Sequence, residues 1–150
     1  MLLDSHPAQR AAVWADPALV PGAVEEILRF PLHPPRGGRP RRAKAGFAVG
    51  DHRVDAGDLV LLSAVAANLD ETAFPDPREF DVRRDATGHL AFGHGPSYCL
   101  GAPLARLELQ AVFTAVPRLL PDLHLAVAAE ELRLRADLGH TAFAELPVTW

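Results

Sequence analysis

Residues 92–101 have the sequence Phe-Gly-His-Gly-Pro-Ser-Tyr-Cys-Leu-Gly, and the interpretation of the whole chain starts from this stretch. It places the only cysteine of the chain, Cys99, in a loop with three glycines. A helix-forming segment follows directly. Because a cysteine thiolate is a good metal ligand, the stretch predicts a thiolate metal site just before a helix.

Size, charge and cysteine usage narrow the class of protein. The chain has 150 residues, of which 49% are hydrophobic, and this is enough to form the core of one domain. Its net charge of −4 argues against nucleic acid as a main partner. A single cysteine excludes an internal disulfide framework and suits a reducing compartment. With no secretion signal and no apolar run near the roughly 18 residues of a membrane span, we expect a soluble cytoplasmic protein.

Periodicity and turn residues indicate a mixed α/β fold that is mainly helical, with a small antiparallel β region. Helices are expected over residues 6–15, 21–30, a short stretch ending at 67, and 102–120. Strands are expected over 47–49, 52–54, 59–62, 123–127 and 146–148, the first two joined by a tight turn at Gly50-Asp51. Two segments are expected to be irregular, a connection over 31–44 and a long meander over 70–87.

The long helix expected over residues 102–120 is apolar on most of its circumference. Four of its polar residues fall at every fourth position and share one narrow stripe: Arg106, Gln110, Thr114 and Arg118. Such a helix needs apolar partners on more than one side, and this chain has few helices to supply them. We therefore expect an exposed apolar face that leads to aggregation or is covered by a partner chain. Pro117 predicts a kink or an early end.

The glycine-rich loop has the chemistry of a cofactor site. Gly93, Gly95 and Gly101 allow positive φ angles and leave no Cβ to hold a flat cofactor away from the backbone. Phe92 supplies an apolar wall. Unpaired N–H groups and the dipole at the start of the following helix would stabilise a thiolate at Cys99. The alternative is that Cys99 is an inert buried residue, as most free cysteines are.

The pattern Phe-Gly-x-Gly-x-x-x-Cys-x-Gly resembles the haem-binding loop of the cytochrome P-450 family. The continuation over residues 102–108, Ala-Pro-Leu-Ala-Arg-Leu-Glu, is similar to that of its soluble bacterial members. The resemblance implies that Cys99 is the axial ligand of the iron of haem b. It also implies a monooxygenase that acts on a small molecule and receives electrons from a ferredoxin-type donor at the cysteine-side surface. The remaining cofactor-binding residues that it implies in this loop are Phe92, Gly93, Gly95 and Gly101.

Three further residues match the family in order along the chain. Glu26 and Arg29 fit its Glu-x-x-Arg helix motif, and residues 80–84 resemble its meander motif, which supplies Arg84 as a third partner. The resemblance implies a structural triad that locks the meander below the cofactor, since paired guanidinium and carboxylate groups fix geometry. Taken alone, Glu26 and Arg29 are an ordinary pair one helical turn apart.

Two residues bear on the haem propionates. Arg41 falls where relatives place an arginine against a propionate, but it also fits a solvated basic loop that includes Arg36, Arg39, Arg42 and Lys44. Both interpretations stay open. Ser97 stands two residues before the cysteine, where relatives commonly carry histidine. Because its hydroxyl is a weaker, uncharged donor, we expect weaker retention of haem.

The resemblance covers almost the whole chain but only the C-terminal part of the family's domain. The acid–alcohol pair that delivers protons to bound oxygen, in a Gly-x-Glu/Asp-Thr setting, does not occur in these 150 residues. Most segments that recognise substrate also fall outside them. We therefore expect residues 1–150 to form one partial domain, a truncated fragment that is not catalytically competent alone.

Other functions remain as alternatives. The chain fits a haem-thiolate monooxygenase segment, or a non-enzymatic relic or auxiliary protein that pairs with and stabilises another chain. A zinc site is weakly supported, because His89, His94 and Cys99 are spaced by five residues, which is not a usual zinc arrangement. A nucleophilic pair of Cys99 and His94 lacks a third group to orient it.

Overall fold

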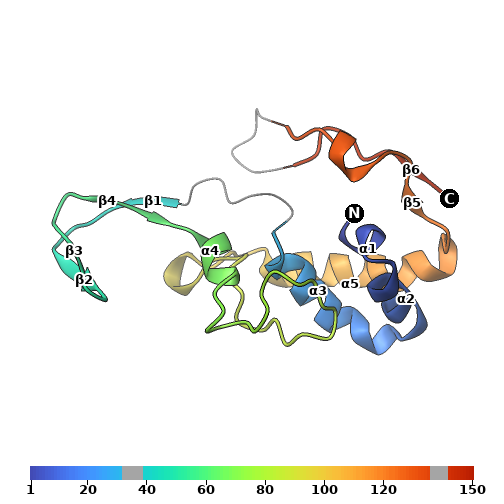
Figure 1. The fold of residues 1–150 in the computed structure, drawn as a ribbon, viewed down its shortest axis with the longest axis horizontal. Helices are drawn as coiled ribbons and strands as arrows, with labels where there is room; N and C mark the ends of the chain where they lie inside the picture. Colours follow the sequence, from blue (N-terminus) through green and yellow to red (C-terminus); the bar gives the residue numbers. More distant parts are fainter. Residues whose placement is uncertain (32–38, 136–141) are drawn as a thin grey trace. The chain divides into compact units, whose positions relative to one another are not determined.

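The computed structural model describes residues 1–31, 39–135 and 142–150 and combines helices with short antiparallel strands (Figure 1). Its α-helices are α1 (Leu2–Ser5), α2 (Pro7–Ala15), α3 (Val20–Arg29), α4 (Ala64–Asn68) and α5 (Ala102–Leu119). Short 3₁₀ turns occur as η1 (Pro17–Leu19), η2 (Gly95–Ser97) and η3 (Ala129–Glu131). The expected fold class, mainly helical with small antiparallel sheets, is confirmed.

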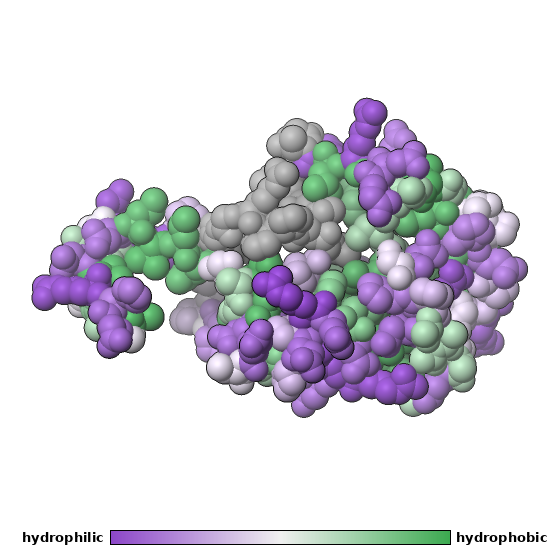
Figure 2. Space-filling view, in the orientation of Figure 1, coloured by the Kyte–Doolittle hydropathy of each residue, from purple (hydrophilic) through white to green (hydrophobic). Residues whose placement is uncertain are grey.

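The described strands form three separate antiparallel pairs. They are β1 (Arg39–Arg42) with β4 (Leu59–Leu62), β2 (Phe47–Val49) with β3 (His52–Val54), and β5 (His124–Leu125) with β6 (Val148–Thr149). The turn between β2 and β3 lies at the predicted place, and Gly50 adopts the positive φ of +54° that such a turn requires. Apolar side chains lie on the surface over β1 and β4 (Figure 2). The exposed ones there include Leu59, Leu61 and Leu62.

The expectation of an irregular connection over 31–44 is wrong for its second half. Residues 39–42 form β1, which pairs with β4 so that Arg41 faces Val60. The sequence Arg-Pro-Arg-Arg has no alternation of apolar and polar residues, so its strand character comes from the apolar partner strand. Residues 32–38 of the expected connection lie outside the described residues.

The N-terminal segment contains one more helix than expected. His6 has φ −128° and ψ 72°, which separates α1 from α2, and Pro7 occupies the first position of α2. A proline is tolerated there because the first N–H groups of a helix have no helical partner. Helix α1 has only four residues, too few to show helical periodicity in the sequence.

The segment over residues 70–87 forms no helix or strand, as the meander expectation requires. Its first turn is fixed by Asp70, whose Oδ1 accepts hydrogen bonds from the hydroxyl of Thr72 at 2.6 Å and from the N–H of Thr72 at 2.8 Å. These hydrogen bonds, the hydroxyl one above all, lower the pKa of the Asp70 carboxyl.

The chain divides into two compact units. Unit one comprises Met1–Ile27, Phe80–Asp85 and Leu100–Trp150, and unit two comprises Leu28–Glu79 and Ala86–Cys99. Unit one contains most of the buried apolar side chains: Leu3, Val13, Val20, Ala23, Val24, Phe80, Val82 and Ala102. The cysteine loop up to Cys99 belongs to unit two. That residues 1–150 form a single partial domain stays a prediction.

Helix α5 continues through Pro117 and ends two residues later, so the expected early end does not occur at the proline itself. Part of its polar stripe packs on α3. The Nε and Nη2 of Arg106 donate to the two carboxylate oxygens of Glu25 at 2.7 and 2.9 Å. Its apolar face is largely open, with Leu107 64% exposed. The other large apolar residues of α5 that are exposed are Leu104, Val112 and Leu119.

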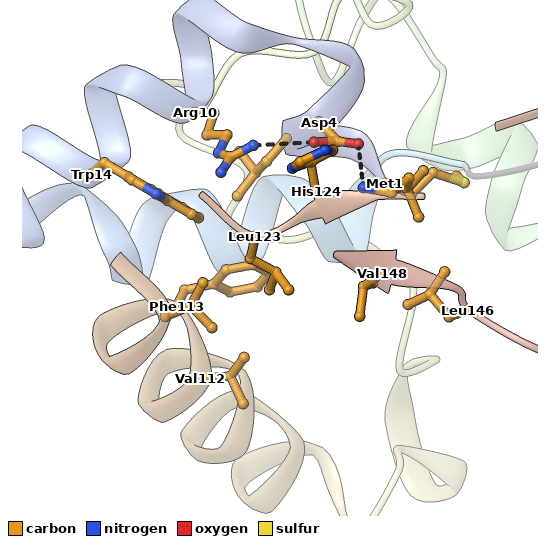
Figure 3. A pocket seen from close by; sticks show the side chains of 13 residues that line it. Met1, Asp4, Arg10, Trp14, Val112, Phe113, Leu123, His124, Leu146 and Val148 are labelled. Atoms are coloured by element: carbon orange, nitrogen blue, oxygen red, sulfur yellow. Dashed lines mark hydrogen bonds and ion pairs between the residues drawn. The ribbon is translucent and has the colours of Figure 1, made fainter. Parts of the chain in front are cut away.

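Asp4 in α1 ties the N-terminal helices of unit one to the strand pair β5–β6. The Oδ1 of Asp4 accepts from Nη1 of Arg10 at 3.1 Å, and its Oδ2 accepts from the N–H of Leu125 in β5 at 3.0 Å. Nη2 of Arg10 donates to the carbonyl of Pro121 at 3.0 Å. These bonds border a largely apolar cavity of about 150 Å³ (Figure 3).

We expect Asp4→Ala to lower the free energy of unfolding by about 1–3 kcal/mol, because the N–H of Leu125 and the Arg10 guanidinium lose their acceptor. Urea denaturation of the chain, followed by tryptophan fluorescence, measures the change, since both tryptophans, Trp14 and Trp150, belong to unit one. Asp122→Ala, which removes an exposed carboxylate close to the same strand, is the control. Equal midpoints for the two variants would contradict this role of Asp4.

Candidate functional site

The loop that carries Cys99 is closed on itself. The N–H of Cys99 donates to the carbonyl of Phe92 at 3.0 Å, and the turn η2 lies between them. Gly93 and Gly95 adopt φ angles of +77° and +68°, a region that favours glycine. A Cβ at Gly95 would have no atom within 4 Å, so the backbone conformation, and not a lack of space, requires glycine there.

The other residues predicted in this loop lie as follows. Phe92 is half-buried, and its ring contacts those of His89 and Tyr98 with centroids 6.0 and 6.5 Å apart. Cys99 is a free, exposed cysteine, which contradicts the alternative of an inert buried residue. Gly101 precedes α5 with φ −81°, a conformation open to any residue, so the freedom expected for a glycine is not used there.

A cavity of about 400 Å³ in unit two brings Arg41 together with the cysteine loop. Arg41 of β1 lines it together with the loop residues Gly93, His94 and Ser97. The remaining lining residues are mostly small or apolar: Leu62, Ser63, Ala64, Ala67, Leu90 and Ala91. Sequence reasoning left Arg41 between a propionate contact and a solvated basic loop. Arg41 lines this cavity, but it is also exposed and its Nη1 donates to the carbonyl of Pro40 at 3.1 Å, so both interpretations stay open, while Arg36 of that loop lies outside the described residues.

These residues fit haem. The backbone at Gly93 and Gly95 presents no Cβ, so a flat ring can approach closely, and the exposed Cys99 offers a sulfur ligand. Arg41 offers a guanidinium, the group that pairs best with a carboxylate. In the described part of the chain, no cluster of three His, Cys, Asp or Glu side chains is arranged to hold a metal ion.

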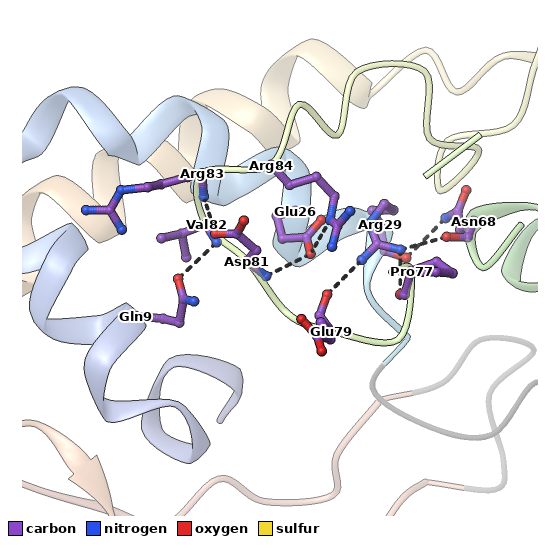
Figure 4. Close-up of polar contacts among 10 residues, drawn as sticks. All are labelled: Gln9, Glu26, Arg29, Asn68, Pro77, Glu79, Asp81, Val82, Arg83 and Arg84. Carbon is purple, nitrogen blue, oxygen red and sulfur yellow. Dashed lines mark hydrogen bonds and ion pairs between the residues drawn. The ribbon is translucent and has the colours of Figure 1, made fainter. Parts of the chain in front are cut away.

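In unit one, Glu26 holds the second half of the meander (Figure 4). Its side chain is fully buried, and its Oε1 accepts from the N–H of Asp81 at 3.1 Å and from Nε of Arg84 at 3.3 Å. The next residue, Val82, donates its N–H to Oε1 of Gln9 in α2 at 3.1 Å. Side-chain hydrogen bonds therefore order the meander, which has no regular secondary structure.

In unit two, Arg29 holds the first half of the meander. It is 1% exposed, and its Nη1 donates to the carbonyls of Asn68 at 2.7 Å and Pro77 at 2.9 Å. Its Nη2 donates to the carbonyl of Glu79 at 3.4 Å, and its guanidinium lies 5.2 Å from the ring centre of Phe74. The sequence pattern identified Arg29 but not these carbonyl acceptors. Residues of every type have a backbone carbonyl, so the residue type does not show which carbonyl accepts.

Sequence reasoning also missed Asn68, the last residue of α4. It is 4% exposed, and its side chain makes hydrogen bonds to Arg29 and to Leu90. The one available signal was its position, a polar amide directly after the apolar run Ala64-Val65-Ala66-Ala67.

Comparison with known proteins agrees with this geometry. The family model for cytochrome P450 matches residues 16–119. The chain belongs to the cytochrome P450 family. No helix among the described residues is long and apolar enough to span a membrane.

Individual P450 relatives are similar along the whole of this chain. It is 44% identical over 150 residues to cytochrome P450-SU2 of Streptomyces griseolus and 44% identical over 157 residues to pentalenolactone synthase of Streptomyces exfoliatus. The solved structure of CYP105P2 from Streptomyces peucetius covers 99% of the chain at 42% identity, with a TM-score of 0.90. That of the LnmA hydroxylase from Streptomyces atroolivaceus covers 99% at 39% identity, with a TM-score of 0.89.

The chain spans 37% and 38% of the length of these two curated relatives, and 38% of each of the two solved chains. The described fold is therefore part of the P450 fold.

We expect Glu26→Ala to destabilise this P450 chain by about 3–5 kcal/mol, because the largely buried Arg84 guanidinium would lose its carboxylate. Chemical denaturation followed by circular dichroism measures the loss. Glu25→Ala is the matched control on the same helix. It removes a more exposed ion pair, with Arg106, and should cost less, about 1–2 kcal/mol. Equal costs for the two variants would contradict the assigned role of Glu26.

Proposed function

We propose that this chain is the haem-binding part of a haem-thiolate monooxygenase, with the iron held by the thiolate of Cys99. The observation that carries the proposal is the exposed Cys99 in a loop whose Gly93 and Gly95 adopt glycine-specific conformations, within a chain of the P450 family. When bound, haem supplies the redox chemistry of substrate oxygenation.

The residues of the chain then have separate roles. Cys99 binds the iron, and its own N–H, bonded to the carbonyl of Phe92, fixes the loop that presents the sulfur. Gly93 and Gly95 allow the ring to approach the backbone, Phe92 contributes an apolar wall, and Gly101 leads into α5. Glu26, Arg29 and Arg84 act indirectly, since they hold the meander.

Arg41 and Ser97 are proposed to hold the propionates. They line one cavity with the cysteine loop, as a site for a flat apolar molecule with an anionic edge requires. The guanidinium of Arg41 supplies a charged, planar donor, whereas the Ser97 hydroxyl is a short neutral one. Most of the electrostatic contribution to haem retention is therefore assigned to Arg41.

We further propose that these 150 residues do not oxygenate a substrate by themselves. They span little more than a third of the length of their relatives, and their sequence lacks the Gly-x-Glu/Asp-Thr motif. A small-molecule substrate, a ferredoxin-type electron donor and a cytoplasmic location are supported by the similarity to bacterial P450s.

A second candidate function is that of an auxiliary chain that pairs with another polypeptide and stabilises it. The open apolar face of α5 favours it, together with Leu100, which precedes α5 and is 98% exposed. An apolar face of this kind is a protein-contact surface by its chemistry. Haem ligation through Cys99 is not needed for that function. A single substitution at Cys99 can therefore distinguish the two candidate functions.

The test is the spectrum of the reduced, haem-loaded chain with carbon monoxide. The wild-type chain should show the Soret shift characteristic of thiolate ligation, and Cys99→Ala should abolish it while leaving the secondary structure unchanged. A wild-type spectrum without that shift would overturn the haem-thiolate proposal. If Cys99→Ala still stabilises a partner chain as the wild type does, the auxiliary function is supported.

Arg41→Ala should weaken haem binding by roughly tenfold, because a charge-assisted hydrogen bond to a carboxylate is lost. Titration of the ligand-free chain with haem, followed by absorbance, measures the dissociation constant. Arg42→Ala is the matched control on the next position of β1, since Arg42 donates instead to the carbonyl of Gly57 at 2.7 Å. An equal effect of both variants would mean that general positive charge, and not a propionate contact, is responsible.

A further inference from the structure

We propose that Asn68 is a positioning residue, which fixes the cysteine loop to the buried guanidinium of Arg29 and so sets the place of the Cys99 thiolate. The inference rests on the proposed function only in its last step, from loop position to iron ligation. All the residues involved belong to unit two.

Asn68 and Arg29 exchange hydrogen bonds. The carbonyl of Asn68 accepts from Nη1 of Arg29 at 2.7 Å, and Nδ2 of Asn68 donates to the carbonyl of Arg29 at 3.2 Å. Both residues are buried, at 4% and 1% exposure. Because a reciprocal pair of buried bonds restrains both partners, the end of α4 and the end of α3 are held in one arrangement (Figure 4).

The remaining polar atom of the Asn68 side chain reaches the cysteine loop. Its Oδ1 accepts from the N–H of Leu90 at 2.7 Å. The carbonyl of Leu90 in turn accepts from the N–H of Gly93 at 3.0 Å, and the carbonyl of Phe92 accepts from the N–H of Cys99 at 3.0 Å. A short series of hydrogen bonds therefore runs from Arg29 through Asn68 into the turn that presents the thiol.

The position requires an amide. Asn68 donates to one backbone carbonyl through Nδ2 and accepts from one backbone N–H through Oδ1, and an amide side chain carries this donor and this acceptor on two separate atoms. Asn68→Leu keeps a similar volume but leaves the N–H of Leu90 and the carbonyl of Arg29 without these partners. Asn68→Asp keeps the acceptor for Leu90 but replaces the donor to the Arg29 carbonyl with a buried carboxylate oxygen, which repels that carbonyl.

The first experiment uses the haem-loaded chain with carbon monoxide. Asn68→Leu should lower the fraction of bound haem with the thiolate-type Soret band by roughly three- to tenfold, because the N–H of Leu90 loses its buried acceptor, and Asn68→Asp, which keeps that acceptor, should restore part of it. Val13→Ala, a destabilising change in the core of unit one, should leave that fraction unchanged. If Asn68→Leu lowers the melting temperature but not the thiolate fraction, Asn68 is structural only and the proposal is overturned.

The second experiment needs no haem. In the ligand-free chain, Asn68→Leu should speed hydrogen exchange at the amides of Leu90, Gly93 and Cys99 by about tenfold, and Val13→Ala should not do so selectively. Unchanged protection at Leu90 and Cys99 would overturn the positioning role even if haem binds. A wild-type chain without a thiolate signature would overturn the proposed function instead, and the exchange rates would still decide whether Asn68 anchors the loop.

Discussion

Arg29 carries a charged guanidinium that is 1% exposed, and the first half of the meander is folded around it. A buried charge is costly unless it is hydrogen-bonded, so the carbonyls of Asn68, Pro77 and Glu79 must stay within reach of its N–H groups. These carbonyls belong to the end of a five-residue helix and to a segment with no regular structure. The guanidinium therefore orders this segment, as backbone hydrogen bonds between strands order a sheet.

The same helix carries the second buried anchor. Glu26 lies one turn before Arg29 on α3 and accepts from the N–H of Asp81 and from Arg84. Two residues of opposite charge on one short helix thus hold the two halves of the meander, each within its own unit. Buried apolar residues of this segment, Phe74, Phe80 and Val82, contribute packing, and the buried polar contacts fix which backbone groups meet. The buried hydrogen bonds of these two side chains explain why the positions need Glu and Arg. An exposed pair one helical turn apart would not require these residues.

Local signals in the sequence were sufficient where one segment determines its own structure. The turn at Gly50 needs only a positive φ, α3 needs only its apolar face and Pro21, and the loop around Cys99 is marked by its glycines. Local signals failed where a partner that is distant in the sequence determines the structure. Strand β1 is formed from Arg-Pro-Arg-Arg because β4 pairs with it, and Asn68 matters because Arg29 and Leu90 lie beside it. The cavity lined by Arg41 and the cysteine loop likewise depends on the path of the chain, and the spacing of residues in the sequence does not reveal that path.

The central claim is that Cys99 places a sulfur on the iron of bound haem. X-ray absorption at the iron edge of the ferric, haem-loaded chain tests it most directly, because it identifies the atoms bonded to the metal. The account predicts one sulfur in the first coordination shell in the wild-type chain and none in Cys99→Ala. A wild-type spectrum fitted by nitrogen and oxygen neighbours alone would contradict it.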